Sequence, residues 1–381
     1  MARYLIAGAG LAGAVLAREL AEGGAEVVVR DERHHVAGNC HTERDAETGV
    51  MVHRYGPHIF NTNSDEAWQY VNRFTPFRPF INRVKAITHK GVFSLPVNLH
   101  TINQFFGEAF SPAEARTFVE GLGDDIAEPA NFEEQGRKLL GSALYETFFD
   151  GYTRKQWGCE PSELPASVLK RLPVRFNYDD NYYNARYQGI PEAGYTAMVE
   201  AILDHPGIKV ELGQAVAPGD GAGFDHLFWS GPLDQYFGCQ LGKLGYRTVY
   251  WTEQRFDGDA LGNAVLNYPD MSVPFTRKHE HKHFTPWEQH HKTIVFTEFS
   301  KATEDGDIPY YPVSRPADKA LFGQYAALAK QTAGVSFIGR LGSYRYLNMD
   351  LVILETLAFA RAFKADPGLT FPPAVEEMLA Q

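Results

Sequence analysis

Hydrophobic and polar positions at the beginning of the sequence follow one another in blocks that predict a strand, a turn, a helix and a second strand. Residues 3–7 contain an apolar run that ends at the glycine-rich segment 8–13. Apolar residues then recur at helical spacing across residues 14–22, and residues 25–30 form another apolar run. Short apolar runs bounded by turn residues are typical of buried strands, whereas a spacing of three or four residues is typical of a helix with one buried face. The pattern therefore predicts a β-α-β unit.

The turn in this unit has glycine at the positions that dinucleotide binding requires. Gly8 permits the tight turn, Gly10 lets the backbone approach a pyrophosphate, and Gly13 lets the helix pack close to the strand. A pyrophosphate bound there lies at the positive N-terminus of the helix. Asp31, at the end of the second strand, can accept hydrogen bonds from a ribose. Because strand, turn, helix and acid occur in this order, the unit predicts a bound dinucleotide.

Patterns further along the chain predict two other kinds of structure. Strand patterns surround a turn at Lys90 and Gly91, and helical patterns fill residues 100–172. Alternating strands are expected between Thr248 and Phe299. The other predicted elements are a helix over 195–205, strands over 208–212, 228–232 and 335–340, and a C-terminal amphipathic helix that contains Leu351, Leu354, Leu357, Ala358 and Phe363.

These elements predict an α/β fold in which a Rossmann-type FAD-binding domain is interrupted by a helical bundle domain and an antiparallel β-sheet domain. Long chains interrupted in this way usually bind FAD, although the spacing alone also permits NAD. The expected domains are the FAD-binding domain (1–80, 194–235 and 312–381), the helical domain with a mobile loop (98–175), and the sheet domain (81–97, 176–193 and 236–311).

The composition is that of a soluble globular protein and narrows the class of partner. Of the 381 residues, 44% are hydrophobic and 22% are charged, and the formal net charge is −11. Such an acidic protein repels phosphates on average, so neither nucleic acid nor an anionic membrane is an expected partner. Cys40, Cys159 and Cys239 lie far apart, which fits a reducing compartment. Without a signal peptide or an apolar stretch of membrane-spanning length, the expected location is the cytoplasm.

Aromatic residues make up 13% of the chain and gather between Tyr145 and Tyr187. Basic residues are interspersed with them, among them Arg154, Arg171 and Arg175. One interpretation is a helical core with a solvated basic face. The other is a pocket that stacks a ring and binds phosphates.

Histidines at alternate positions form a second candidate cluster. His279, His281 and His283 share one face of a predicted strand and could bind zinc. Their alternation with Glu280 and Lys282 is more typical of an ordinary strand, so no metal site is predicted.

Several sequence blocks, taken together, resemble the family of bacterial UDP-galactopyranose mutases. They occur in the family's order from residue 3 to about residue 350. The resemblance implies a homodimer that interconverts UDP-galactopyranose and UDP-galactofuranose on reduced FAD, without net redox change, and supplies galactofuranose for cell-surface glycans. The blocks are 55–60, 151–158, 170–176, 187–191, 280–284, 310–313 and 339–341.

The resemblance also assigns residues to the cofactor and the substrate. On the cofactor side are Gly8, Gly10, Leu11, Ala12 and Gly13 (pyrophosphate), Asp31 (ribose), Gly38 and Asn39 (second flavin loop), His58 and Ile59 (isoalloxazine), and Arg247, Arg340, Asn348 and Met349. On the substrate side are Phe148, Phe149, Tyr152, Trp157 and Asn267 (uridine), Arg171, Tyr182, Arg277, Tyr311 and Tyr346 (diphosphate), and Asn82 (sugar). The residues expected to act in catalysis are Arg171, Arg277 and His58.

Three positions depart from the family's pattern. Asp31 stands where Glu is frequent, Ala37 replaces a common glycine in the second flavin loop, and Leu347-Asn348 replaces a more polar Tyr-Asp pair. The last change removes a carboxylate near the expected flavin site.

Ring contraction of the sugar requires a nucleophile that holds it while the ring opens and closes. No pair of carboxylates stands out among the aromatic and basic residues, so a glycosidase-like mechanism has little support. A reduced flavin can supply the nucleophile through N5, in an N5–sugar adduct, while Arg171 and Arg277 neutralise the departing diphosphate. The alternatives are a redox flavoenzyme of the amine oxidase-like fold and a non-enzymatic binding protein. We also expect the segment 158–175, which carries Arg171, to close over the substrate as a lid.

Overall fold

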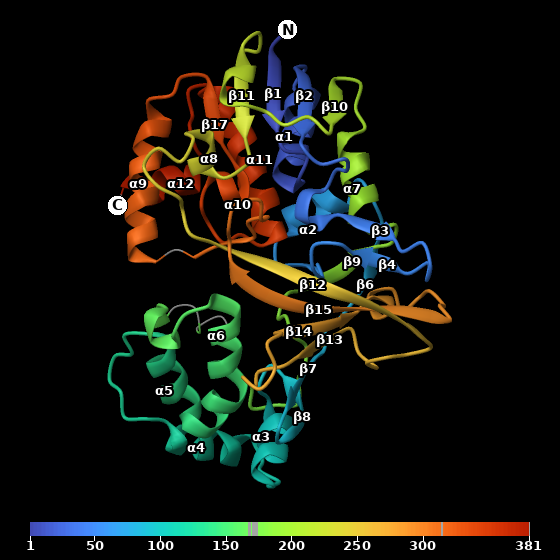
Figure 1. Cartoon of the computed structure of the whole chain (residues 1–381), viewed down its shortest axis with the longest axis vertical. Coiled ribbons are helices and arrows are strands. Elements are labelled where there is room, and N and C mark those ends of the chain that lie inside the picture. Colours follow the sequence, from blue (N-terminus) through green and yellow to red (C-terminus); the bar gives the residue numbers. More distant parts are fainter. Residues whose placement is uncertain (167–168, 170–173, 314, 381) are drawn as a thin grey trace.

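The computed structural model describes every residue except 167–168, 170–173, 314 and 381. Figure 1 shows three parts: an upper part with a parallel sheet and helices, a central and lower antiparallel sheet, and a group of helices beside that sheet. The predicted α/β fold, with a Rossmann-type unit and two insertions of different kinds, is confirmed.

Three separate stretches of the chain build the five-stranded sheet of the upper part. All of its neighbouring strands are parallel. Its order is β10 (Ile208–Leu212), β2 (Glu26–Asp31), β1 (Arg3–Ala7), β11 (His226–Trp229) and β17 (Val335–Phe337).

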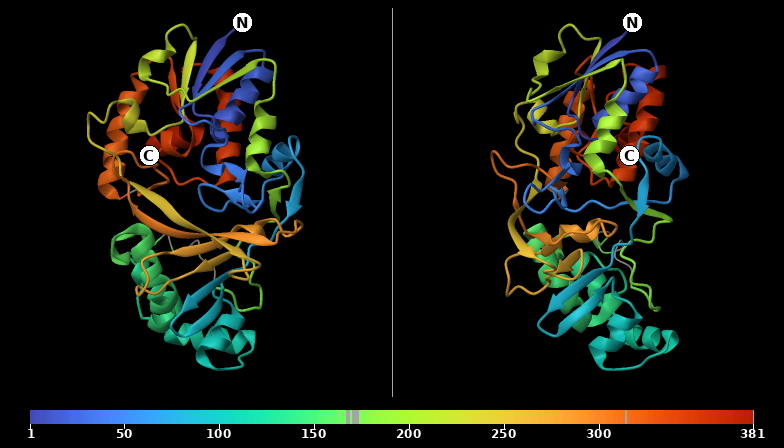
Figure 2. Two further views of the ribbon diagram at one scale, coloured as in Figure 1. Left: turned by 45° about the vertical axis from the view of Figure 1, so that its right-hand side comes forward. Right: turned by 90° about the vertical axis from the view of Figure 1, so that its right-hand side faces the viewer.

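Helices cover both faces of this sheet, because side chains of a strand alternate between the faces. In β1, Ile6 packs into the core on the side of α1 (Leu11–Glu22), α7 (Gly194–Leu203) and α11 (Met349–Ala365). Leu5 and Ala7 pack into the core on the side of α9 (Pro316–Lys330) and α12 (Pro373–Ala380). Figure 2 shows these two groups of helices on either side of the strands.

A seven-stranded sheet lies below the parallel sheet, and its two longest strands run across the middle of the molecule (Figure 1). Its neighbouring strands are antiparallel except β13 and β7, which are parallel. Its order is β16 (Tyr311–Pro312), β12 (Tyr246–Asp257), β15 (Lys292–Ala302), β14 (Arg277–Glu280), β13 (Val265–Asn267), β7 (Val84–Thr88) and β8 (Gly91–Leu95).

Two smaller sheets connect the parts. In one, β9 (Tyr187–Pro191) pairs with β5 (Phe60–Thr62) and β6 (Phe77–Pro79). This strand was expected in the antiparallel sheet domain, but it pairs instead with strands from the N-terminal segment. In the other, β3 (Thr42–Arg44) pairs with β4 (Met51–His53).

The helices beside the seven-stranded sheet come from residues 99–157. They are α3 (Leu99–Phe106), α4 (Pro112–Leu122), α5 (Phe132–Tyr145), the π-helical segment η2 (Glu146–Asp150) and α6 (Gly151–Trp157). The other short helices among the described residues are α2 (Asp65–Asn72), α8 (Leu233–Tyr236), α10 (Gly339–Gly342), η1 (Gly38–Cys40), η3 (Pro161–Glu163), η5 (Pro218–Gly221) and η6 (His281–Phe284).

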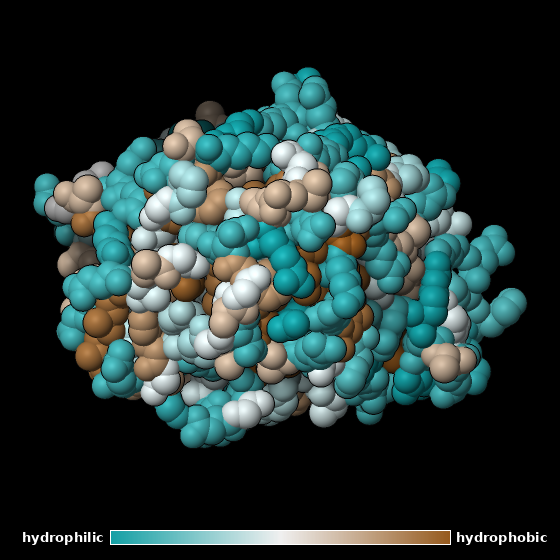
Figure 3. Space-filling view, turned by 90° about the horizontal axis from the view of Figure 1, so that it is seen from above, coloured by the Kyte–Doolittle hydropathy of each residue, from teal (hydrophilic) through white to brown (hydrophobic). Residues whose placement is uncertain are grey.

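The upper end of the molecule is covered mainly by hydrophilic side chains, with hydrophobic ones in small separate patches (Figure 3). No helix in the described part of the chain combines the length and the apolar character needed to cross a lipid bilayer.

Candidate active site

The glycine turn between β1 and α1 leaves room only for backbone. A Cβ at Gly13 would overlap the carbonyl oxygen of Gly8, and a Cβ at Gly8 would overlap the hydroxyl of Ser230 in the segment after β11. The N-terminus of α1 has no side-chain cap, so its first N–H groups can bind an anion. The predicted β-α-β unit is confirmed, and its turn has the form that a pyrophosphate requires.

Asp31 supports this turn from the end of β2. Its carboxylate accepts hydrogen bonds from the N–H of Ala9 at 2.8 Å and from the N–H of Arg33 at 2.9 Å. Asp31, although shorter than the Glu that is frequent at this position, therefore fixes the turn. Each of its carboxylate oxygens keeps a lone pair that can face a ribose.

The second flavin loop comes close to the same turn. A Cβ at Gly38 would lie 3.1 Å from the Cα of Gly10. Ala37, which replaces a glycine of the family's pattern, has a φ of +74°, in the left-handed region that favours glycine. Ala37 thus adopts a conformation that a glycine at this position would adopt without strain. The Asn39 side chain accepts a hydrogen bond from Arg33 at 3.0 Å.

His58 is held by backbone hydrogen bonds next to a group of buried histidines. Its Nδ1 lies 2.7 Å from the oxygen of Gly56, and its N–H donates to Nδ1 of His53 at 3.0 Å. Burial lowers the pKa of His58 to about 4, with the charges of Arg340 and Arg277 acting in the same direction. At neutral pH the ring is therefore uncharged. The adjacent Ile59 is buried.

The C-terminal segment brings an arginine and two tyrosines together. The rings of Tyr311 and Tyr346 stack with centroids 5.5 Å apart, and the Arg340 guanidinium lies 5.4 Å and 5.3 Å from their centroids. Arg340 also donates to the oxygen of Leu347 at 3.1 Å, just before the N-terminus of α11. That N-terminus, at Asn348 and Met349, has no side-chain cap.

Arg277 is the best-fixed cation of this region. Its Nε and Nη2 donate to the Glu298 carboxylate at 2.9, 2.7 and 2.8 Å. Burial lowers the pKa of Arg277, but the Glu298 carboxylate and the neighbouring tyrosines together outweigh it and hold the pKa well above its usual value, so the guanidinium stays charged. The side chain of Glu298 is 1% exposed, whereas that of Arg277 is 24% exposed and can therefore reach a ligand.

Protonated tyrosines surround Arg277. Tyr152, Tyr182 and Tyr311 all interact electrostatically with its charge. Burial raises the pKa of Tyr152 and Tyr182, and it raises the pKa of Tyr311 to about 12. At neutral pH the three hydroxyls can therefore donate hydrogen bonds to phosphate oxygens.

Two buried amides have an acceptor without a partner. Asn82 is 3% exposed and Asn267 is 8% exposed, and the Oδ1 atom of each has no hydrogen bond within the described part of the chain. Buried acceptors are normally paired, so each marks a place where a ligand or water donates. Both residues belong to the predicted substrate site.

Comparison with known proteins accounts for this arrangement. A family model described as UDP-galactopyranose mutase matches residues 147–346, and a model described as NAD(P)-binding Rossmann-like domain matches residues 6–74. A Klebsiella pneumoniae protein named probable UDP-galactopyranose mutase is 51% identical over 360 residues, which are 94% of each chain. The chain belongs to the UDP-galactopyranose mutase family. A dTDP-fucopyranose mutase of Escherichia coli is 46% identical over 95% of this chain and 98% of its own.

Solved structures give the same fold. A crystal structure of a reduced UDP-galactopyranose mutase has a TM-score of 0.76 at 15% identity, and the match covers 99% of this chain and 98% of that chain. A putative protoporphyrinogen oxidase from Exiguobacterium has a TM-score of 0.65 at 12% identity. As a member of the UDP-galactopyranose mutase family, the protein is an isomerase with FAD as its cofactor. This turn fits that cofactor, because the N-terminus of α1 has no side-chain cap and the glycines at 8 and 13 leave no room for a side chain.

Other residues assigned by the resemblance have contacts within the protein. Arg247, assigned to the cofactor side, donates to the oxygen of Gln156 at 3.0 Å and to that of Lys155 at 3.3 Å, at the end of α6. Phe148 is buried and packs edge-on against Phe93 at 5.3 Å. Phe149 and Trp157 are partly buried. Arg171 lies outside the described residues, as do 167–168, 170 and 172–173 of the expected lid.

The prediction that His279, His281 and His283 share one face of a strand is wrong. β14 ends at Glu280, and His281 begins the 3₁₀ turn η6, so the three side chains do not share a strand face. His279 and His281 are buried, and burial lowers the pKa of His281 to about 3. The ligand atoms of Asp259, Glu280 and His283 come within 4.8 Å of one another.

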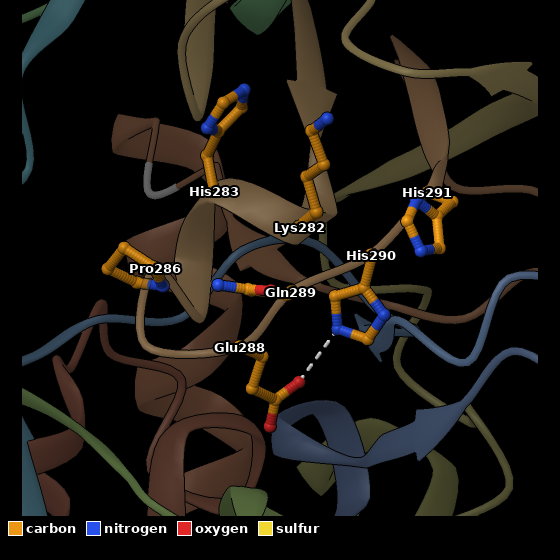
Figure 4. Close-up of a pocket in the computed structure, with 7 residues that line it drawn as sticks. All are labelled: Lys282, His283, Pro286, Glu288, Gln289, His290 and His291. Carbon is orange, nitrogen blue, oxygen red and sulfur yellow. Dashed lines mark hydrogen bonds and ion pairs between the residues drawn. The ribbon is translucent and has the colours of Figure 1, made fainter.

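The surface around η6 does not provide a second anion site. A pocket there is lined by Lys282, His283, Pro286, Glu288, Gln289, His290 and His291 (Figure 4). Its basic groups already face carboxylates: His290 lies 2.9 Å from Glu288, and Lys282 lies 3.6 Å from Asp259. Lys282 and His290 therefore already have carboxylate partners within the protein.

Sequence reasoning missed Glu298, which holds Arg277. The available signal was a single carboxylate in the apolar stretch 294–299, where a strand side chain is buried. A buried carboxylate needs a cationic partner, and Arg277 was already a candidate.

Proposed function

We propose that the protein interconverts UDP-galactopyranose and UDP-galactofuranose with FAD in its reduced form. The observation that supports this most directly is the 51% identity, over 94% of the chain, to a protein named probable UDP-galactopyranose mutase. The chemistry of the predicted substrate region also supports it: the region contains one charged arginine, three protonated tyrosines and two buried amide oxygens without a hydrogen bond among the described residues.

Arg277 would bind the diphosphate and stabilise the charge that develops as UDP leaves the sugar. Glu298 fixes the guanidinium, so little reorganisation is needed when the negative charge arrives. Tyr152, Tyr182 and Tyr311 would donate to phosphate oxygens, because their hydroxyls keep their protons.

The other residues would orient the sugar and the cofactor. Asn82 and Asn267 would accept hydrogen bonds from the nucleotide sugar through their free Oδ1 atoms. His58, uncharged at neutral pH, would present a neutral ring to the isoalloxazine. Reduced FAD, when bound, supplies a nucleophilic ring nitrogen for the anomeric carbon. Arg340 and the N-terminus of α11 would lie beside the flavin.

The test is a product assay with purified holoenzyme. Dithionite-reduced protein is incubated with UDP-galactofuranose, and the products are separated by chromatography. We expect UDP-galactopyranose to form without stoichiometric use of reductant, and the air-oxidised protein to be inactive. Full activity of the oxidised enzyme under air would contradict the reduced-flavin mechanism, and no conversion in either state would contradict the proposed function.

A second candidate substrate follows from the relative in Escherichia coli. That protein is named dTDP-fucopyranose mutase and is 46% identical to this chain. Its substrate differs in the base, the ribose and the C6 hydroxyl, so the two activities can be separated by kinetics. We expect kcat/KM to be higher for UDP-galactopyranose. A higher value for dTDP-fucopyranose would assign this chain to the other reaction.

We also propose that the protein is a cytoplasmic homodimer. Light scattering on the eluate of a size-exclusion column should give twice the chain mass of 42.6 kDa. A single-chain mass at micromolar concentration would contradict the dimer.

A further inference from the structure

Lys155 is a charged residue of α6 whose ammonium group points into a loop of the sheet. Its Nζ lies within hydrogen-bond distance of four carbonyl oxygens, and its three N–H groups are shared among them. These are the oxygens of Tyr268 at 2.5 Å, Asp270 at 2.8 Å, Val273 at 3.2 Å and Phe275 at 2.9 Å. All four acceptors belong to the connection between β13 and β14. The ammonium group of Lys155 therefore binds four carbonyl oxygens of one loop and holds them close together.

This loop separates two residues of the candidate site. Asn267 ends β13 on one side of it, and Arg277 begins β14 on the other. The hydrogen bond from the N–H of Tyr268 to the oxygen of Thr276, at 2.9 Å, closes its base. The loop therefore joins the backbone positions of Asn267 and Arg277, and its base is held by this hydrogen bond.

Helix α6, which carries Lys155, also contributes to the site. Tyr152 precedes Lys155 by about one turn on this helix, and Trp157 ends the helix. Lys155 thus connects the helix expected to contact uridine with the loop between Asn267 and Arg277.

Two further contacts hold α6 against the sheet. A Cβ at Gly151 would overlap the carbonyl oxygen of Pro269 and would lie 3.1 Å from Cγ of Met271, so the helix approaches the loop more closely than another residue would allow. At the other end of α6, Ser300 donates to the oxygen of Gln156 at 2.8 Å. The position of α6 is therefore determined on both sides of Lys155.

The charged side chains near the loop have partners of their own. Asp270 accepts a hydrogen bond from the N–H of His89 at 2.7 Å. Lys278 lies over the rings of Tyr268 and Phe275, at 5.8 Å and 5.2 Å from their centroids, without a hydrogen bond to the loop carbonyls among those described. Lys278→Met thus removes a positive charge beside the same loop without removing a hydrogen bond to its carbonyl groups, and this makes it a suitable control.

We propose that Lys155 is a positioning residue of the nucleotide-sugar site, which sets the loop between Asn267 and Arg277 against α6. This inference rests on the proposed function, because the site it positions is the UDP site. Lys155 acts through the loop carbonyls and does not need to touch the substrate.

The first test compares Lys155→Met with Lys278→Met in the full-length holoenzyme. The FAD content gives the fraction of correctly folded protein, and titration with UDP gives the Kd of that folded fraction. We expect Lys155→Met to retain FAD and to raise the Kd for UDP, and the KM for the UDP-sugar, at least tenfold. Lys278→Met should stay within about twofold of the wild type. Lys155→Arg should recover part of the affinity, because the guanidinium also donates to carbonyl groups.

A second pair of variants covers the case in which Lys155→Met does not accumulate as soluble protein. Gly151→Ala pushes α6 away from Pro269, whereas Gly121→Ala adds a methyl group on α4 where nothing lies within 4 Å. Gly151→Ala should raise the Kd for UDP with FAD retained, and Gly121→Ala should not.

Wild-type affinity for UDP in both Lys155→Met and Gly151→Ala would overturn the proposal, as would a loss of affinity that only follows the loss of FAD or of folded protein. An inactive wild-type enzyme that binds no UDP would instead contradict the proposed function. The two failures are therefore distinguishable.

Discussion

Arg277 is expected to act on the transition state rather than on binding alone. Its guanidinium is fixed by Glu298 before substrate arrives, so its interaction with the diphosphate grows as the leaving group gains charge. Arg277→Ala should therefore lower kcat by about 30- to 1,000-fold, which corresponds to about 2–4 kcal/mol. Steady-state kinetics of the reduced enzyme measures this change.

Two further variants serve as comparisons for Arg277→Ala. Arg277→Lys should recover only part of the rate, because an ammonium cannot form the bidentate contact with Glu298 and the diphosphate. Tyr152→Ala should mainly raise KM, as expected for a residue whose contact with the nucleotide is equal in the ground state and the transition state. Unchanged kcat in Arg277→Ala would show that the diphosphate binds elsewhere.

Gly13 is expected to be indispensable for flavin binding. A side chain there would overlap the oxygen of Gly8 and separate α1 from β1. Gly13→Ala should lower the free energy of unfolding by about 1–3 kcal/mol and reduce the FAD content of the purified protein. The flavin absorbance per protein chain measures the effect, and Gly219→Ala, with nothing within 4 Å of its Cβ, is the control. Normal flavin content in Gly13→Ala would contradict this account of the turn.

At the scale of elements, Glu280 at the end of β14 organises a neighbouring loop. Its carboxylate accepts hydrogen bonds from the N–H groups of Ala260, Leu261 and Gly262 at 3.0, 2.6 and 3.2 Å. Burial raises the pKa of Glu280, but hydrogen bonds from His283 and the loop outweigh it and lower the pKa to about 2. The hydrogen bond to Glu280 in turn raises the pKa of His283.

This network predicts a pH dependence of stability. Because the pKa of Glu280 is lower in the folded state than its usual 4.5, the stability that it contributes is present above pH 4.5 and is lost as the pH falls towards 2. His283 has the opposite sign: its contribution is present below pH 6.5 and is lost as the pH rises through its raised pKa.

Thermal unfolding between about pH 6 and about pH 3 tests this dependence. Glu280→Gln should lower the stability at pH 6 by about 1.5–3 kcal/mol and should reduce the further loss on acidification. An equal loss on acidification in the variant and the wild type would mean that other carboxylates dominate.

The same elements show how far the sequence determines the structure. The β-α-β unit could be predicted because its strand and helix patterns and its glycines are local. The pairing of β9 with β5 and β6 could not, because nothing within residues 187–191 encodes a partner more than a hundred residues away. The contacts of Lys155 could not be predicted for the same reason, because its four acceptors are backbone atoms of a loop that is distant in the sequence.

The candidate site, like the fold, could be predicted from the sequence only in part. The resemblance assigned Arg277, Asn82 and Asn267, which have the burial and the free or charged groups that a ligand needs. It did not include Glu298, because a residue that positions another is recognised only once the distance between them is known.

For the molecule as a whole, FAD should contribute directly to folding stability. The sheet that carries the glycine turn is made of three separate stretches of chain, so a ligand at that turn binds the folded state only. FAD at 100 times its Kd should add about 2.7 kcal/mol to the free energy of unfolding, and the melting temperature should rise as the FAD concentration rises. Calorimetry of apoprotein titrated with FAD measures this. Equal melting temperatures with and without FAD would contradict it.

The order β10-β2-β1-β11-β17 also has a consequence for synthesis on the ribosome. β1 is made first, but its sheet receives its edge strand β17 only after more than 300 further residues have been translated. At typical translation rates this delay is roughly 15–65 s, which is long compared with the folding of a helical segment. The helices from residues 99–157 and the β12–β15 pair therefore emerge and can fold while the parallel sheet is still incomplete. Flavin capture is then one of the last events in the formation of the native protein.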